Sequence, residues 1–135
     1  MTAARPLQAA DLSLIHLVAA RRRGEPVPSL DPRTLEAVVD ELSEDPGAPR
    51  TVFERGARLA AAVAGAIPGP LGRQVALLAL LCQLRLDGYQ LTAPQGVLAA
   101  MVAAVAARPQ DTAGLSRWLE DRAMPGASTR SGVGW

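Results

Sequence analysis

Residues 66–75, Ala-Ile-Pro-Gly-Pro-Leu-Gly-Arg-Gln-Val, are the segment whose residue types and spacing come closest to a chemical motif. A glycine-rich loop that opens a helix often holds a phosphate, because backbone N–H groups and the positive end of the helix dipole point at the anion. This segment has no histidine and no carboxylate, and Arg73 is its only charged residue. Three interpretations follow: a working anion site, a site that has lost its chemistry, or only a turn.

Two other side chains could take part in acid–base or thiol chemistry. His16 is the only histidine and shares a helical face with Leu12 and Ile15, which is more typical of a hydrogen-bonded, half-buried histidine than of a catalytic one. Cys82 is the only cysteine, which rules out an internal disulfide and a multi-cysteine metal site. Because Cys82 ends the apolar run 75–82, we expect a buried and unreactive thiol. No set of metal ligands is predicted.

The remaining polar and aromatic residues are predicted to have structural roles. Arg21–Arg23 suit the C-terminal end of a helix, where a positive charge is favourable; contact with an acidic partner is the alternative. Four residues are expected to cap helix N-termini: Asp31, Thr51, Glu54 and Asp111. Trp118 is expected in the core, and Trp135, at the end of a glycine-rich tail, is assigned no role.

The elements that must position these residues are predicted to be helices. Apolar residues recur at three- and four-residue spacing, and no convincing two-residue alternation is present. Helices are expected over residues 9–23, 31–42, 51–65 and 71–87, from 92 or 93 to 107, and from 111 onward. Residues 75–82 are apolar on all sides, which is typical of the buried centre of a bundle. Residues 89–91 are expected to be extended.

The sequence predicts one compact all-α domain of about six helices around the central helix 71–87. We expect a flexible N-terminus at residues 1–6, the domain at 7–124 and a disordered tail at 125–135. The chain has 135 residues, 49% of them apolar, which suffices for one core.

Charge and hydropathy exclude some classes of partner. A net charge of +1 is too balanced to predict nucleic-acid binding. The longest apolar run is far shorter than the ~20 residues of a membrane span, and the N-terminus lacks the apolar core of a secretion signal. We therefore expect a cytoplasmic protein that binds neither membranes nor nucleic acids.

Five segments, taken in order, carry a resemblance to a known family. They are LQAADLSLIHLVAA (7–20), SLDPRTLEAVVDEL (29–42), TVFERGARLAAAVAGAI (51–67), LDGYQLTAP (86–94) and DTAGLSRWLEDRA (111–123). Over residues 7–123 the chain resembles the death-on-curing (Doc) branch of the Fic/Doc, or Fido, family. The resemblance implies a Fic/Doc-like helical fold, a bacterial toxin–antitoxin origin and a protein partner, such as a small antitoxin-like protein.

The family's active-site motif, His-x-Phe-x-[Asp/Glu]-[Gly/Ala]-Asn-[Gly/Lys]-Arg, opens its central helix. Anchoring the comparison on Gly88 places this motif on residues 66–74 without a gap. Its histidine then falls at Ala66, its phenylalanine at Pro68, its acidic residue at Pro70, its small residue at Leu71, its asparagine at Gly72, its lysine at Arg73 and its arginine at Gln74. Only Arg73 is chemically similar, so the resemblance extends to the scaffold and not to the site.

Family members transfer a phosphate or a nucleotide monophosphate to a protein hydroxyl, with the histidine as general base and the acidic residue holding a divalent cation. Ala66 cannot accept the proton, and the loss of a general base typically costs ~10²–10⁴-fold in rate. Pro70 offers no metal ligand, and Pro68 and Pro70 have no N–H to give to a phosphate.

What remains is at most a weak anion site, formed by Arg73 with the N–H groups of Gly69, Leu71 and Gly72. A solvated or ion-paired Arg73 in the first helical turn is the favoured interpretation. The resemblance thus implies a catalytically inactive binding or regulatory module, a pseudoenzyme that needs no cofactor and binds nucleotide or phosphate weakly at most.

Two alternatives stay open at this point. One is a diverged but active Doc-type toxin, for which His16, Glu54 and Asp87 are the candidate replacements for the base and the metal ligand. The other is an all-α adaptor domain unrelated to the family, in which residues 66–75 are only a turn.

Overall fold

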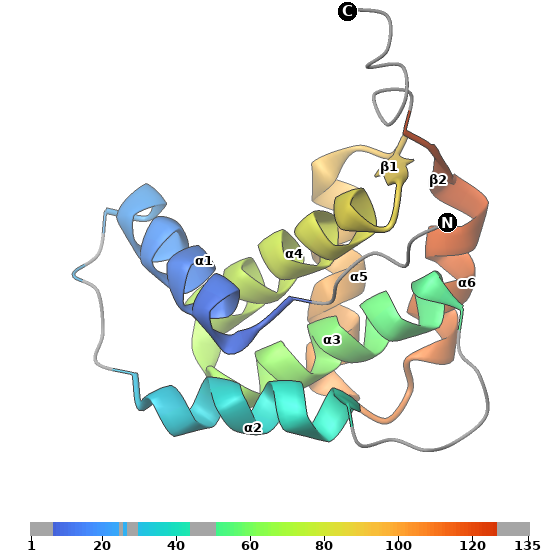
Figure 1. The fold of residues 1–135 in the computed structure, drawn as a ribbon. Helices are drawn as coiled ribbons and strands as arrows, with labels where there is room; N and C mark the ends of the chain where they lie inside the picture. Colours follow the sequence, from blue (N-terminus) through green and yellow to red (C-terminus); the bar gives the residue numbers. More distant parts are fainter. Residues whose placement is uncertain (1–6, 25, 27–29, 44–50, 127–135) are drawn as a thin grey trace, which may run out of the picture.

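The computed structural model describes residues 7–24, 26, 30–43 and 51–126. Six helices and two short strands make up this part of the chain (Figure 1). In order they are α1 (Ala9–Arg22), α2 (Pro32–Ser43), α3 (Val52–Ala66), α4 (Gly69–Leu86), β1 (Tyr89–Leu91), α5 (Gln95–Ala107), α6 (Ala113–Arg122) and β2 (Ala123–Pro125). The predicted fold class is confirmed, since these elements form one compact all-α domain with a small sheet. The predicted N-terminal segment 1–6 and tail residues 127–135, with Trp135, lie outside the described residues.

Two helix starts follow from local sequence as predicted. Thr51 and Glu54 form a capping box, in which Glu54 N–H donates to Thr51 Oγ1 at 3.1 Å and Thr51 N–H donates to Glu54 Oε1 at 2.8 Å. Asp31 Oδ1 accepts a hydrogen bond from the N–H of Arg33 at 3.0 Å, and α2 begins at Pro32.

The start of α6 corrects a prediction. Asp111 is not the cap: Thr112 occupies the N-cap position, and no side chain accepts a hydrogen bond there. Asp111 N–H instead donates to Arg108 O at 2.9 Å, within the turn that follows α5. Further along α6, Trp118 is half-buried against the core, and the Arg122 guanidinium lies 6.0 Å from the centroid of its ring.

The helices α3 and α4 together form the centre of the domain. They lie antiparallel and make the most extensive contact, and Gly56 of α3 is so close to α4 that a Cβ there would lie 2.8 Å from Leu80 Cδ1. Helix α1 packs on α4, α2 and α6 pack on α3, and α5 contacts both central helices (Figure 1). The predicted single central helix is therefore one member of a central pair.

Helix α4 is not buried on all sides, contrary to the prediction. Leu78 and Leu81 are half-buried, Leu86 is 41% exposed, and Cys82 is exposed. The prediction of a buried cysteine is therefore wrong. The run 75–82 contains no polar residue that would mark an outer face, so the packing of α1, α3 and α5 decides which stripe stays outside.

A two-stranded antiparallel sheet joins the chain after α4 to the end of α6. The register pairs Tyr89 with Pro125, Gln90 with Met124, and Leu91 with Ala123. Gly88 has a φ of +91°, which favours glycine, and its carbonyl accepts a hydrogen bond from Gly126 N–H at 2.7 Å. The extended segment 89–91 is confirmed. Strand β2 was not predicted, and it includes Pro125, which we expected to begin the tail.

A buried amide fixes the N-terminal segment to α4. Gln83 Oε1 accepts a hydrogen bond from Leu7 N–H at 2.8 Å, and Gln83 Nε2 donates to Asp87 Oδ2 at 3.5 Å. Leu7 and Gln83 are both 7% exposed. A buried N–H without a partner is costly, so this bond holds the chain in place before α1 begins.

Helix α5 is the most uniformly apolar helix, yet much of it faces outward. Only Leu98, Val102 and Val105 are buried, and Val97 is 44% exposed. None of the helices in the described ranges combines the length and apolarity needed to cross a membrane.

Candidate functional site

The segment singled out from the sequence connects α3 to α4. Ala66 is the last residue of α3, and the N–H of Ile67 donates to Val63 O at 3.0 Å. Pro68 is extended and occupies the N-cap of α4, with no side-chain hydrogen bond. Gly69 has a φ of +80°, a conformation that other residues rarely adopt. Gly69 thus lets the chain reverse direction between two antiparallel helices.

Gly72 is the residue whose identity this turn constrains most. A Cβ at Gly72 would lie 1.6 Å from Ile67 O and 2.6 Å from Ile67 C. Both are backbone atoms, so no side-chain rotation could relieve the overlap. The position at which the resemblance places an asparagine is therefore closed to any side chain by the backbone of the turn itself.

The four predicted anion-binding residues, Gly69, Leu71, Gly72 and Arg73, lie within the first five residues of α4. Arg73 is exposed, Leu71 and Gly72 are buried, and Pro70 supplies no N–H. The carbonyl oxygen of Ile67 lies against Gly72, which puts the negative end of a peptide dipole where the anion was expected. The weak anion site stays a prediction.

Two of the candidate replacement groups lie far from this turn. Glu54 is in the first turn of α3 and holds the capping box, and at the usual rise per residue it lies about 18 Å along the helix from Ala66. Asp87 is the C-cap of α4, a helix of 18 residues, and so lies about 27 Å from the start of that helix. The structure therefore does not bring Glu54 and Asp87 together at the turn.

The third candidate, His16, is more enclosed than predicted. It is 4% exposed on the inner face of α1, and its imidazole ring makes no hydrogen bond to another described residue. Within the described ranges, no fully buried side-chain nitrogen or oxygen lacks a partner. The expectation of a half-buried histidine is thus wrong, because the side chain is buried, and the hydrogen bond of its ring stays a prediction.

Burial favours the neutral form of both His16 and Asp87. Loss of solvent lowers the pKa of His16, because the charged imidazolium is poorly solvated there. Burial raises the pKa of Asp87, while the hydrogen bond from Gln83 and the positive charge of Arg55 act in the opposite direction. For both groups, lost hydration is the largest cause of the pKa shift.

The exposed Cys82 is not activated either. Neighbouring atoms remove enough water from the thiol to raise the pKa of Cys82, an effect that Arg85 opposes and Asp11 reinforces. A raised pKa keeps the sulfur in the unreactive thiol form. Across the described ranges, no three His, Cys, Asp or Glu side chains lie close enough together to hold a metal ion.

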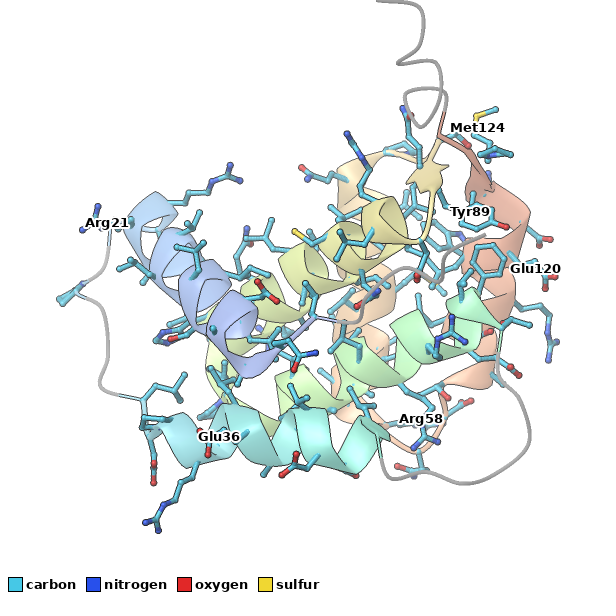
Figure 2. All side chains as sticks on the ribbon, in the orientation of Figure 1. Arg21, Glu36, Arg58, Tyr89, Glu120 and Met124 are labelled. Carbon is cyan, nitrogen blue, oxygen red and sulfur yellow. The ribbon has the colours of Figure 1, made fainter. Side chains whose placement is uncertain are left out.

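A pocket of about 200 Å³ lies away from the turn, between α2, α3 and the connection from α5 to α6. Its lining residues are Glu41, Leu42, Arg58, Ala61, Ala62, Pro109, Gln110 and Thr112. Figure 2 shows Arg58 pointing from α3 toward this region. No residue of the α3–α4 turn takes part in it.

The sequence analysis missed two structural features of α4, one toward its C-terminal end at Gln83 and one at its start at Gly72. Gln83 is a lone amide in an apolar stretch, and such isolation is a detectable signal of a buried polar contact. The close approach of Ile67 O to Gly72 has no comparable signal, because it depends on the path of the turn.

No protein-family model, no curated protein and no solved structure matches the chain. The resemblance to the Fic/Doc family therefore stays a prediction.

Proposed function

We propose that this chain is a protein-binding module on a Fic/Doc-like helical scaffold that does not transfer phosphate or nucleotide monophosphate. The observation that carries the proposal is the α3–α4 turn. At the place where the resemblance puts the catalytic motif, the turn offers Ala66 and Pro70 instead of a base and a metal ligand. The backbone of Ile67 fills the space beside Gly72.

The helical arrangement supports the scaffold half of this proposal. The turn opens one of the two central helices, as the resemblance requires. The short extended segment that corresponds to the family's Asn-Gly-Tyr-x-Leu stretch follows that helix as β1. A bacterial toxin–antitoxin origin, a cytoplasmic location and a small antitoxin-like partner belong to the proposal through the resemblance alone.

The contacts of the alternative catalytic residues weigh against an active transferase. Such an enzyme would need a base and a metal ligand at the turn, yet Glu54 is engaged in capping α3 and Asp87 lies at the opposite end of α4. His16 is buried on the inner face of α1, and burial lowers its pKa. No step of phosphoryl transfer can be assigned to these groups in their present positions.

The test is isothermal titration of the full chain with ATP, with and without Mg²⁺. We expect no saturable binding tighter than about 1 mM, which corresponds to about 4 kcal/mol of binding free energy. Saturable, Mg²⁺-dependent 1:1 binding would overturn the proposal, because it requires a metal ligand at the nucleotide.

The variant Arg73→Ala provides the matched control. Weak binding that is independent of Mg²⁺ and lost in Arg73→Ala would identify the anion site at the first turn of α4 without restoring transfer chemistry. A parallel incubation with radiolabelled ATP checks the same point directly, since transfer of label to the chain or to an added protein would also contradict the proposal.

A further inference from the structure

The pocket between α2, α3 and the α5–α6 connection is lined by side chains of both charges. Glu41 lies in the last turn of α2, and Arg58 lies in the first half of α3 (Figure 2). The carboxylate of Glu41 makes no hydrogen bond or ion pair with another described residue, so Glu41 and Arg58 are not paired with each other. The wall of the pocket therefore presents one anion and one cation at separate points.

Two uncharged polar side chains line the same pocket from the α5–α6 connection, Gln110 and Thr112. Thr112 occupies the N-cap of α6, where a threonine hydroxyl usually accepts a hydrogen bond from the helix, but its side chain accepts none. Within the described ranges, neither side chain hydrogen-bonds to another residue. An amide and a hydroxyl can each donate and accept, so both are available to a ligand.

The more enclosed part of the wall is apolar. Ala61 is buried, Leu42 and Ala62 are half-buried, and the exposed Pro109 completes this part. The volume of about 200 Å³ is below the roughly 300–1,000 Å³ of sites for drug-sized ligands. The pocket therefore suits a small ligand that has an apolar portion as well as polar groups.

We infer that this pocket binds a small α-amino acid with an apolar side chain, its carboxylate toward Arg58, its ammonium group toward Glu41 and its side chain toward Leu42 and Ala62. A guanidinium can bind a carboxylate through two parallel N–H···O bonds, and its five N–H donors allow it to bind a ligand in addition to a protein group. The ligand carries both charges because the wall does: a simple anion would meet the carboxylate of Glu41, and a simple cation would meet Arg58.

This inference goes beyond the proposed function, because the pocket contains no residue of the α3–α4 turn. The two can fail separately. Mg²⁺-dependent nucleotide binding would remove the pseudoenzyme proposal without bearing on the pocket, and a chain that binds no amino acid would leave the interpretation of the turn unchanged.

The probe is L-leucine, titrated into the full chain by isothermal calorimetry. Three analogues each lack one recognised group: isocaproate has no ammonium group, isopentylamine has no carboxylate, and glycine has no apolar side chain. We expect saturable 1:1 binding of leucine with a Kd of about 1 mM or tighter. Each analogue should bind at least about tenfold more weakly, because each leaves one part of the wall without its partner.

Two charge variants assign each end of the ligand to its residue. In Arg58→Gln, leucine should bind at least about tenfold more weakly than to the wild type and no more tightly than isopentylamine does, since the carboxylate has lost its partner. In Glu41→Gln, leucine and isocaproate should bind alike. Arg33→Gln and Glu36→Gln, at exposed positions of α2 outside the pocket, are the matched controls and should keep the preference of the wild type.

A third variant fills the pocket without changing its charge. Ala62→Phe should weaken leucine binding at least about tenfold, whereas Ala99→Phe, at an exposed position of α5, should leave it unchanged. Circular dichroism verifies that each variant is folded, and Glu41→Gln, at an exposed side chain, keeps the test decisive if Arg58→Gln does not fold.

Three results would overturn the inference. The first is the absence of saturable leucine binding to the wild-type chain. The second is isocaproate or isopentylamine binding as tightly as leucine, which would assign the pocket to a simple anion or a simple cation. The third is leucine binding that Glu41→Gln and Ala62→Phe leave unchanged, which would place the amino acid elsewhere on the chain.

Discussion

The two ends of α4 are built in different ways. At its start, Ile67–Gly72, the turn is held by backbone geometry: a left-handed Gly69, two prolines and a carbonyl packed on Gly72. At its end, Gln83–Leu91, the structure is held by side-chain and inter-strand hydrogen bonds through Gln83, Asp87 and β1. We call these regions the turn end and the sheet end. The end at which the resemblance places the family's motif is thus the one where the described residues show no polar side-chain contacts.

This difference predicts which kind of substitution destabilises each end. The turn end depends on the absence of side chains, so adding atoms should harm it most. The sheet end depends on specific polar pairs, so removing one partner should destabilise it. Neither dependence requires a ligand, which agrees with a turn that serves the fold.

The largest effect is expected from Gly72→Ala at the turn end. Its Cβ would overlap Ile67 O, and the backbone must move to relieve the clash, which should cost about 3 kcal/mol of unfolding free energy or more. Urea unfolding followed by circular dichroism measures this loss. Gly65→Ala is the control, because nothing lies within 4 Å of its Cβ on α3 and it should be neutral or stabilise by up to ~1 kcal/mol. Equal effects of the two substitutions would remove the special status of Gly72.

At the sheet end, Gln83→Met should lower the free energy of unfolding by about 1–3 kcal/mol. The substitution keeps the volume but leaves the buried N–H of Leu7 without its acceptor. Thermal and urea unfolding give the value. Gln74→Met, at a half-buried position of the same helix, should change stability by no more than ~0.5 kcal/mol, and a loss there as large as that of Gln83→Met would show that the Leu7 bond is not the cause.

A smaller effect is expected from Thr51→Ala, which removes the cap of α3. This cap is near the sheet end, because the rings of Phe53 and Tyr89 pack edge-on with their centroids 5.0 Å apart. Loss of the hydrogen bond from Glu54 N–H should cost about 1 kcal/mol. Thr112→Ala, at an N-cap without a side-chain hydrogen bond, should cost much less in the same unfolding assay. The reverse order would contradict the assignment of caps.

The smallest effects are expected from pH. Burial lowers the pKa of His16 below its ordinary value of 6.5, so its contribution to stability is full above pH 6.5 and is lost as the pH falls through the folded-state pKa. Burial raises the pKa of Asp87 above 3.8, so its contribution is full below pH 3.8 and is lost as the pH rises through the folded-state pKa.

Melting temperatures of the wild type, His16→Gln and Asp87→Asn between pH 3.5 and 8 separate these two groups. We expect His16→Gln to flatten the decline below pH 6.5, and Asp87→Asn to gain stability relative to the wild type as the pH rises. Parallel curves of melting temperature against pH for all three proteins would mean that neither side chain changes its pKa on folding.

The parts of the fold that sequence predicted are those in which one residue meets a neighbour a few positions away. The box of Thr51 and Glu54 and the Asp31–Pro32 start are confirmed because each bond closes within three residues. Asp111 failed although its type was right, because the turn after α5 moved the N-cap by one residue. The helical class followed from the periodicity of nearly every segment.

The parts that sequence could not predict depend on contacts between distant segments. The exposure of Cys82 depends on which sides of α4 are covered by α1, α3 and α5. A run of apolar residues does not indicate which of its sides will be covered. Strand β2 exists because Ala123–Pro125 reach β1, although Pro125 indicates a break by itself. At the candidate site, the resemblance alone places Ala66 and Pro70 where the family has a base and a metal ligand, whereas the closure of Gly72 by Ile67 could not be predicted from the sequence.

The short sheet has a further consequence for the way the domain comes apart. Leu91 pairs with Ala123, so the two ends of the segment 92–122 lie side by side. The segment, which contains α5 and α6, is therefore a loop closed by the sheet. Opening this loop requires the release of a few inter-strand hydrogen bonds and of the contacts with α3 and α4, and it leaves the path of the other helices unchanged. Such a segment can exchange its amide hydrogens as one unit, ahead of global unfolding. The domain is thus a four-helix body, α1 to α4, that carries α5 and α6 as a pair attached through the β1–β2 sheet and through contacts with α3 and α4.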